Sequence, residues 1–255
     1  MKSLLTLAIA LSSISAFGAN TSVGKIDFCR DRVEGNYVQE LLKERESRMA
    51  FANHGGLANG GVCWWHSRFQ RNAAYLTFYS PEKKRPTDSE AKDIIKDIRK
   101  GKKVVEIPGF RNFNEFSRAF ASEIQDRLEG WQRTDGFINQ SWITGLAGKT
   151  ETTPEKLQEI MDELYSQVSQ GEVVYQKLQL KGIIAHAWLV IDMEKTRDGY
   201  VLSVVDSNSP SSTNAYTFRS GMTSLHYPYF GKFVPYTHKD NEEEKLKKVV
   251  QSYCD

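Results

Sequence analysis

The hydrophobic pattern of this 255-residue chain changes its period near residue 172. Before that point, apolar residues such as Trp65, Phe69 and Ala73 recur every three or four positions, which is typical of buried helices. After it, β-branched and aromatic residues gather in runs that favour strands. These runs are residues 173–180, 183–193 and 200–205. Residues 195–199 have the composition of a hairpin turn. Helices followed by an antiparallel sheet predict an α+β fold.

The same patterns predict where the other elements lie. Expected helices are residues 36–49, 63–76, 89–99, 113–130, 153–171 and 241–253, and a short strand is expected at residues 104–107. No repeat or linker divides the chain, so residues 20–255 are expected to form a single domain. Within it, a helical insertion is expected around residues 85–150. The charged run at residues 242–245 is interpreted as a solvated helix face.

The first 19 residues have the pattern of a signal peptide. One lysine precedes an apolar run at residues 4–11, and small residues follow it, so cleavage is expected after residues 16–18 or after Ala19. An N-terminal helix packed on the body of the protein is the alternative. No other apolar run reaches the roughly 20 residues of a membrane span. We therefore expect a secreted or periplasmic protein without a membrane partner, and whether residues 20–50 form a pro-segment stays open.

The charge balance limits the partners of this chain. It has 34 Lys and Arg residues against 32 Asp and Glu residues, a formal net charge of +2. Binding to a nucleic acid backbone requires an excess of positive charge on one surface. Nucleic acid is therefore not an expected partner, and the 40% apolar content is that of a folded globular protein.

The cysteine count is odd in a chain that we expect to reach an oxidising compartment. Cys29 lies near the mature N-terminus and Cys254 is the penultimate residue. Because chain ends are often close in space, a Cys29–Cys254 disulfide is predicted. Cys63 is then a free thiol. Taken alone, such a thiol is more often a buried hydrophobe than a nucleophile.

Cys63 follows a glycine-rich segment at the start of an expected helix. Residues 54–61 contain four glycines, which indicates a tight turn or a close approach of the backbone. The unpaired N–H groups and the dipole of a helix N-terminus favour a thiolate. Cys63 is therefore a candidate nucleophile. Its N–H group and a side chain from the preceding loop are candidate donors to an oxyanion.

A histidine and two possible partners follow in the strand region. His186 interrupts the apolar run at residues 183–191, while Asp206 and Asn208 stand where the next strand ends. Folding the hairpin about residues 196 and 197 brings His186 opposite residues 206–208. Strand alternation puts Asp206 and Asn208 on the same face, so both stay candidates. The charge of Asp206 favours it as the partner of an imidazolium.

The order of these residues resembles that of the papain-like cysteine peptidase superfamily. The motifs are Gly-Val-Cys-Trp at 61–64, Ala-His-Ala at 185–187 and Val-Asp-Ser-Asn at 205–208. The resemblance covers residues 51–79 and 153–210. It implies a papain-like fold in which Cys63 is the nucleophile, His186 the general base and then acid, and Asp206 the residue that orients the imidazole.

The resemblance also bears on the oxyanion hole and on a second family. Papain-like enzymes commonly place a glutamine six residues before the cysteine, where this chain has Leu57. Asn59 or Asn53 is the candidate replacement. The Gly-Val-Cys and His-Ala-Trp motifs are also similar to those of the transglutaminase-like branch. That branch usually has a shorter spacing than the 123 residues between Cys63 and His186.

These observations predict an exported cysteine peptidase or amidase that hydrolyses an amide bond through a thioester, without a cofactor. A peptide or protein is the expected substrate, a peptidoglycan stem peptide among the possibilities. The alternatives are a transglutaminase-like acyl transferase and a non-catalytic binding protein. His54, Cys63 and His66 are close in sequence, but Cys-x-x-His is half of a zinc site and no second pair follows, so no metal is expected. His66 is interpreted as a helix-surface residue.

Overall fold

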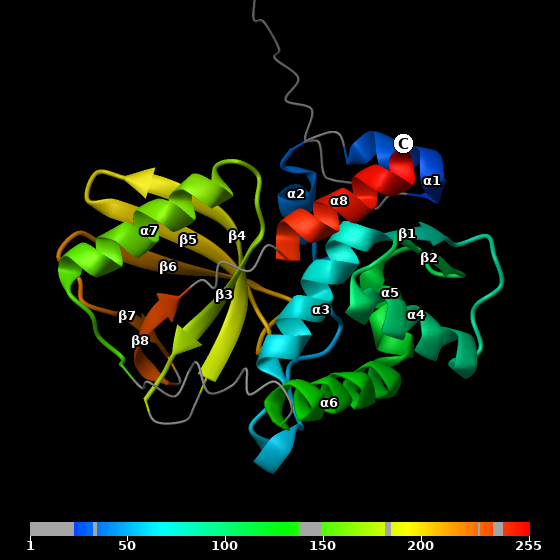
Figure 1. The fold of residues 1–255 in the computed structure, drawn as a ribbon, viewed down its shortest axis with the longest axis horizontal. Coiled ribbons are helices and arrows are strands. Elements are labelled where there is room, and N and C mark those ends of the chain that lie inside the picture. The colour runs from blue at the N-terminus through cyan, green and yellow to red at the C-terminus, as the bar shows by residue number, and fades with distance from the viewer. Residues whose placement is uncertain (1–22, 33–34, 138–148, 182–184, 229, 237–241) are drawn as a thin grey trace, which may run out of the picture.

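A computed structural model describes residues 23–32, 35–137, 149–181, 185–228, 230–236 and 242–255. A helical N-terminal half packs on a six-stranded antiparallel sheet (Figure 1), which confirms the α+β prediction. The predicted signal peptide and its cleavage positions lie outside the described residues, as does the part of the expected insertion at 138–148. Among the described residues, no helix combines the length and the apolar character needed to cross a membrane.

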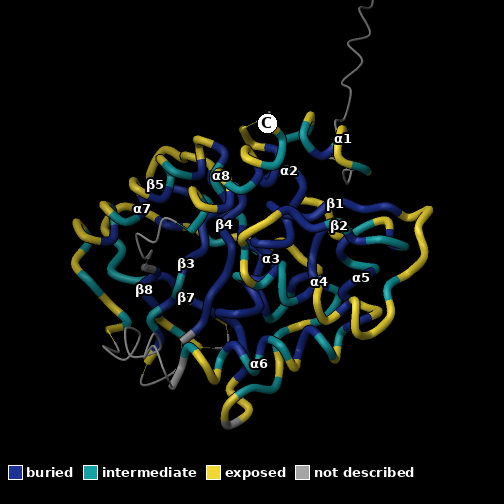
Figure 2. Tube along the Cα trace, turned by 45° about the vertical axis from the view of Figure 1, so that its right-hand side comes forward, coloured by how far each residue is buried: buried dark blue, intermediate teal, exposed yellow. Residues whose placement is uncertain are grey.

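The helical half surrounds one central helix. Its helices are α1 (Gly24–Asp31), α2 (Tyr37–Lys43), α3 (Cys63–Leu76), α4 (Asp88–Lys100), α5 (Phe113–Ala119) and α6 (Ala121–Phe137), with the 3-10 turns η1 (Arg45–Ser47) and η2 (Leu57–Asn59). Beside them, the parallel strands β1 (Thr77–Ser80) and β2 (Val105–Pro108) form a two-stranded sheet. Every residue of α3 except Arg68 is buried. Helix α3 lies between the large sheet and the helices α4 and α5 (Figure 1), and Figure 2 shows the exposed residues gathered on the outer loops and helices.

Local sequence signals place the ends of two helices. Thr87 accepts a hydrogen bond from the backbone N–H of Glu90, whose carboxylate accepts one from the N–H of Thr87, a capping box that starts α4. Gly101 ends this helix with a φ of 65°, a left-handed conformation that suits glycine. Helix α7 (Pro154–Val168) starts after Thr153, whose side chain caps it.

The large sheet has the strand order β6-β5-β4-β3-β8-β7. Its strands are β3 (Val174–Gln179), β4 (Ala185–Thr196), β5 (Gly199–Asp206), β6 (Thr213–Arg219), β7 (Leu225–Tyr227) and β8 (Gly231–Tyr236). From Ala187 to Ile191, strand β4 is buried on both faces. Ala187 and Leu189 belong to the hydrophobic core around α3, whereas Trp188 and Val190 belong to a second core under α7. Burial on both faces explains why residues 187–191 are continuously apolar.

Two predicted helices differ from those observed. The helix expected at 36–49 ends at Lys43, because the buried Arg48 guanidinium donates to the carbonyl oxygens of Leu42 (2.6 Å) and Lys43 (2.9 Å). These are the carbonyls that a continuing helix would use. The helix expected at 113–130 is divided at Phe120 into α5 and α6, where the ring of Phe120 packs against that of Phe116 (centroids 5.3 Å apart).

Strands β1, β6, β7 and β8 have weaker sequence signals than the predicted ones. Strand β6 lies at the edge of the sheet and is mostly exposed, so its sequence lacks an apolar run. Strands β1 and β7 contain only four and three residues. Periodicity does not separate segments this short from loops.

The interpretation of residues 242–245 as a solvated face is wrong for its first half. In helix α8 (Glu242–Cys254), the Glu242 carboxylate pairs with Arg68 and Arg71 of α3. Glu243 accepts a hydrogen bond from the hydroxyl group of Tyr75 (2.5 Å). Only the second half of the run, Glu244 and Lys245, is exposed. The acidic start of α8 therefore anchors this helix on α3.

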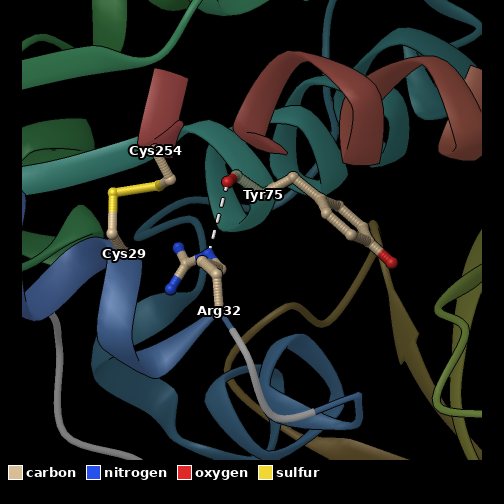
Figure 3. The surroundings of a disulfide bond; sticks show 4 residues. All are labelled: Cys29, Arg32, Tyr75 and Cys254. Atoms are coloured by element: carbon tan, nitrogen blue, oxygen red, sulfur yellow. Dashed lines mark hydrogen bonds between the residues drawn. A yellow bond between two sulfur atoms is a disulfide. The ribbon is translucent and has the colours of Figure 1, made fainter. Parts of the chain in front are cut away.

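The predicted disulfide between Cys29 and Cys254 is present and joins α1 to α8 (Figure 3). The two Cα atoms are 5.5 Å apart across a sequence separation of 225 residues. Nearby, the Arg32 guanidinium donates to the carbonyl oxygens of Ala74 (3.0 Å) and Tyr75 (3.4 Å) in the last turn of α3. The disulfide thus lies at the C-terminal end of α3, whereas Cys63 is at the N-terminal end. A helix of 14 residues separates these ends by about 20 Å.

Candidate active site

Cys63 is the first residue of α3 and the cysteine that is not part of the disulfide. Its side chain is largely buried, with 6% exposed. The N-cap residue, Val62, makes no side-chain capping bond to this helix. The first-turn N–H groups, which lack partners within the helix, point toward the end where Cys63 stands. Negative charge on or near its sulfur is therefore favoured by the helix dipole.

The glycine-rich loop before Cys63 is held by α6. The Glu129 carboxylate accepts from the N–H of Gly56 (3.1 Å), and the Gln132 side-chain amide donates to the carbonyl of Gly61 (2.9 Å). Gly61 has a φ of 85°, and a Cβ atom there would come within 2.5 Å of the Asn53 side-chain nitrogen. Glycine is thus required where the chain enters the helix. The helical insertion predicted around 85–150 includes α6, the helix that fixes this loop.

Helix α3 is fastened to β4 beside Cys63. The indole N–H of Trp64 donates to the carbonyl oxygen of His186 (3.1 Å). One turn farther, the hydroxyl group of Ser67 donates to the carbonyl of Ala187 (3.1 Å). These two bonds fix the position of α3 along the strand, and the structure brings Cys63 and His186 together.

His186 connects the thiol to a carboxylate. Its Nε2 atom lies 2.7 Å from Oδ1 of Asp206, and its side chain is also hydrogen-bonded to that of Cys63. Since Asp206 occupies Nε2, the nitrogen that serves Cys63 is Nδ1. Burial alone lowers the pKa of His186, but the hydrogen bonds to Asp206 and Cys63, together with their charges, raise this pKa to about 10. The arrangement therefore stabilises an imidazolium.

Asp206 is the residue that contacts His186, and it is almost fully buried. Its carboxylate also accepts hydrogen bonds from the backbone N–H of Asn208 (2.8 Å) and from the hydroxyl group of Tyr227 (2.7 Å). Burial raises the pKa of a carboxyl group, but the bond to His186 and the other donors hold the pKa of Asp206 below its usual value. Asp206 therefore stays ionised beside the imidazole.

Asn208 has a different part in the site. Its side-chain oxygen accepts from the amide of Asn53 (3.0 Å), and its own amide donates to the hydroxyl group of Tyr227 (3.3 Å). Asn53 in turn accepts from the backbone N–H of Val62 (2.5 Å), immediately before the helix. With the bond from Tyr227 to the carboxylate beside His186, these contacts close a ring. This ring joins the backbone next to the thiol to the residue that holds the imidazole.

The two oxyanion candidates lie in different settings. Asn59 ends the turn η2, is exposed and has a φ of 56°. Asn53 is partly buried, and its side chain makes the two bonds of the ring just described. Because these bonds occupy the side chain of Asn53, Asn59 is the more available of the two. The role of Asn59 as an oxyanion donor stays a prediction.

Two aromatic residues of the site were not foreseen. The His186 ring packs against Tyr227 (centroids 5.4 Å apart) and Phe230 (5.9 Å), and those two rings stack on each other (5.1 Å). Both belong to the aromatic-rich stretch at 227–236. The density of aromatic residues in this stretch is the sequence signal that could have indicated their role, but no pattern connects it to a histidine about 40 residues earlier.

The interpretation of His66 as a surface residue is wrong. It is fully buried because α3 is enclosed on almost every side. Its Nε2 atom lies 3.0 Å from the carbonyl oxygen of Phe51, and burial lowers its pKa to about 4. In the described part of the chain, no three His, Cys, Asp or Glu residues are grouped so that they could hold a metal ion.

The site thus joins a thiol, an imidazole and a buried carboxylate in one hydrogen-bonded series. Comparisons of this chain with family models, curated proteins and solved structures find no match. A connected series of this kind can move a proton from a thiol to an imidazole and stabilise the resulting ion pair.

Proposed function

We propose that this chain is an exported cysteine hydrolase with a papain-like fold, which cleaves an amide bond of a peptide or protein through a thioester intermediate. The observation that carries the proposal is the contact of His186 with both Asp206 and Cys63. A buried thiol without function needs neither an imidazole beside it nor an ionised carboxylate behind that imidazole. Burying these two groups costs stability unless they are paired.

The reaction uses the site residues in turn. The Cys63 thiolate attacks the carbonyl carbon, and the carbonyl oxygen takes up the negative charge. His186 then gives its Nδ1 proton to the leaving amine as the C–N bond breaks, which leaves a thioester on Cys63. Next, His186 takes a proton from a water molecule that attacks the thioester, and returns it to the sulfur as the acid product leaves. Asp206 keeps the imidazole oriented and stabilises its charged form.

The oxyanion is stabilised at the start of α3. Backbone N–H groups of the first helical turn, that of Cys63 first among them, donate to the developing charge. Asn59 is the side chain that we assign as the second donor. The glycine loop that carries it is tied to α6 through Glu129 and Gln132, so the donors are positioned before the substrate binds.

Two observations support export. Residues 1–19 have the pattern of a signal peptide. The disulfide between Cys29 and Cys254 fits an oxidising compartment such as the periplasm or the extracellular space. Support for the papain-like fold comes from the order of elements: a helix that starts at Cys63, then His186 on a strand, and then Asp206 on the adjacent strand.

The decisive experiment is the rate of Cys63 alkylation by iodoacetamide as a function of pH. The other two cysteines are paired, so labelling reports on Cys63 alone. We expect fast labelling well below the free-thiol pKa of about 8.5. The His186→Ala variant should lose it, and the control His226→Ala, which changes an exposed histidine on β7, should keep it. Labelling of the wild type that follows an ordinary thiol and ignores His186 would falsify the proposal.

Product analysis then separates hydrolysis from its alternatives. Hydrolysis releases one amine and one acid without consuming a second amine. An acyl transferase consumes an added amine instead, and a non-catalytic binding protein keeps its biological activity in the Cys63→Ala variant. We expect release of the free acid, and its complete loss in Cys63→Ala.

A further inference from the structure

An exposed aromatic ring lies directly beside the proposed general base. Phe230 is 37% exposed, and its ring centroid is 5.9 Å from that of His186. Among the described residues, only three other large hydrophobic side chains are exposed: Val23, Ile26 and Leu57. Two of them lie at the start of the chain around α1, and the third in the glycine loop. An exposed phenylalanine next to a buried histidine is therefore unusual on this protein.

The ring of Phe230 is held in place by a second aromatic ring. Phe230 stacks on Tyr227 with centroids 5.1 Å apart and an angle of 19° between the rings. Tyr227 is buried and fixed by its hydroxyl group, which donates to Asp206. Phe230 thus rests on the residue that supports the carboxylate. An aromatic surface fixed in this way is prepared to receive an apolar group without further ordering.

The proton transfer from His186 to the leaving amine indicates which part of the substrate lies near the ring of Phe230. In the proposed reaction, Cys63 bonds to the acyl carbon and His186 protonates the departing nitrogen. The leaving portion of the substrate therefore lies on the His186 side of the thiolate. The ring of Phe230 packs against that of His186, so its exposed face is available to this leaving portion of the substrate.

We propose that Phe230 forms the wall of an apolar subsite for the residue that follows the cleaved bond, so that the substrate is a peptide segment with an aromatic or branched aliphatic side chain at that position. This inference rests on the proposed function, because it uses the positions of the thiolate and the base. It favours protein substrates over peptidoglycan stem peptides, whose residues are small or charged.

The first test is digestion of a peptide library by the mature protein, with cleavage sites read by mass spectrometry. Only sites that disappear with the Cys63→Ala variant count. We expect Leu, Ile, Phe, Tyr or Met to be enriched directly after the cleaved bond. Cleavage by Cys63 without such enrichment, or cleavage confined to stem peptides, overturns the inference and leaves the hydrolase intact. Absence of any Cys63-dependent cleavage overturns both.

The second test uses two peptides that differ only in having Leu or Gly after the cleaved bond. The wild type should prefer the Leu peptide by roughly tenfold or more in kcat/KM, the usual scale for an apolar contact in a pocket. Phe230→Ala should lose this preference, and Phe230→Leu should keep most of it. Ile26→Ala removes an equally apolar but more exposed side chain on α1 and serves as the control. A preference that survives in Phe230→Ala contradicts the proposal.

Discussion

Two buried histidines near the start of α3 have different surroundings. His66 lies one turn along α3 and His186 on β4, and neither is more than 2% exposed. His66 meets the carbonyl oxygen of Phe51, and its Nδ1 atom has no hydrogen-bond partner among the described residues. Burial lowers its pKa to about 4. His186 is equally buried, but Asp206 and Cys63 raise its pKa to about 10.

The difference shows that burial by itself does not create a reactive site. A low-dielectric environment disfavours the charged imidazole at both positions, and only His186 has an anionic partner that reverses the effect. The proton on His186 therefore stabilises the fold fully below pH 6.5, and this contribution is lost as the pH rises through about 10. Protonation of His66 destabilises the fold, because the unfolded chain takes up this proton more readily than the folded one.

Removal of the charge behind His186 should have the largest effect. In Asp206→Asn the imidazole loses the partner that orients it and stabilises its charged form. We expect kcat/KM for a peptide found by the library digestion to fall on the order of 10³–10⁴-fold. Iodoacetamide labelling of Cys63 near neutral pH should slow in parallel. A loss smaller than about tenfold would mean that Asp206 is only a structural cap, since a positioned base contributes more than that.

The acid stability of the fold should depend on His66. Its pKa falls from 6.5 to about 4 on folding, so the free energy of unfolding should decrease by about 3 kcal/mol as the pH drops through this window. In His66→Gln, an amide can still donate to Phe51 but takes up no proton. Urea titrations at pH 7 and pH 4 should show a smaller decrease for the variant. Equal decreases for both proteins would place His66 in contact with water.

Loss of the Tyr227 hydroxyl group should have a smaller effect on the same site. Tyr227→Phe keeps the ring but removes a donor from Asp206 and a contact to Asn208. We expect kcat to fall roughly tenfold, the usual worth of a hydrogen bond to a charged group. Without this donor the pKa of Asp206 rises, so the acidic limb of the kcat/KM profile should move to higher pH.

The matched control for Tyr227 is Tyr216→Phe. Tyr216 stacks beside Tyr227 with ring centroids 6.2 Å apart, so its replacement by phenylalanine alters the same aromatic cluster. The pH profile of kcat/KM for Tyr216→Phe should match that of the wild type. An acidic limb that moves equally in both variants would indicate a general loosening of the cluster rather than the loss of one hydrogen bond.

Local patterns in the sequence were sufficient for much of the fold. The period of apolar residues predicted α3 and the β4–β5 hairpin. The hairpin pairs Asp206 with Trp188, two residues after His186, and the His186 side chain reaches Asp206 from there. Nearness of the chain ends predicted the disulfide. Each of these follows from short-range geometry, because the spacing along a helix or across a hairpin is fixed by the backbone.

Contacts between segments that are far apart in the sequence could not be predicted from these local patterns. Periodicity indicated one face for both Asp206 and Asn208. The structure distinguishes them, because His186 contacts Asp206 whereas the Asn208 side chain bonds to Asn53 and Tyr227. Similarly, Glu242 looks solvent-exposed from its charged neighbours, but it pairs with Arg68 of α3. A sequence pattern says which way a side chain points, not which other segment lies there.

The sequence by itself determined that Cys63 begins a helix after a glycine-rich turn, and that His186 stands on a strand facing a carboxylate, because both follow from local backbone geometry. The tertiary structure alone decided that α3 docks on β4 through Trp64, which brings thiol and imidazole together. It also decided that His66 is buried against the carbonyl oxygen of Phe51, where burial outweighs the attraction of Asp206. Long-range packing selects these neighbours, and with them the electrostatic environment of each titratable group.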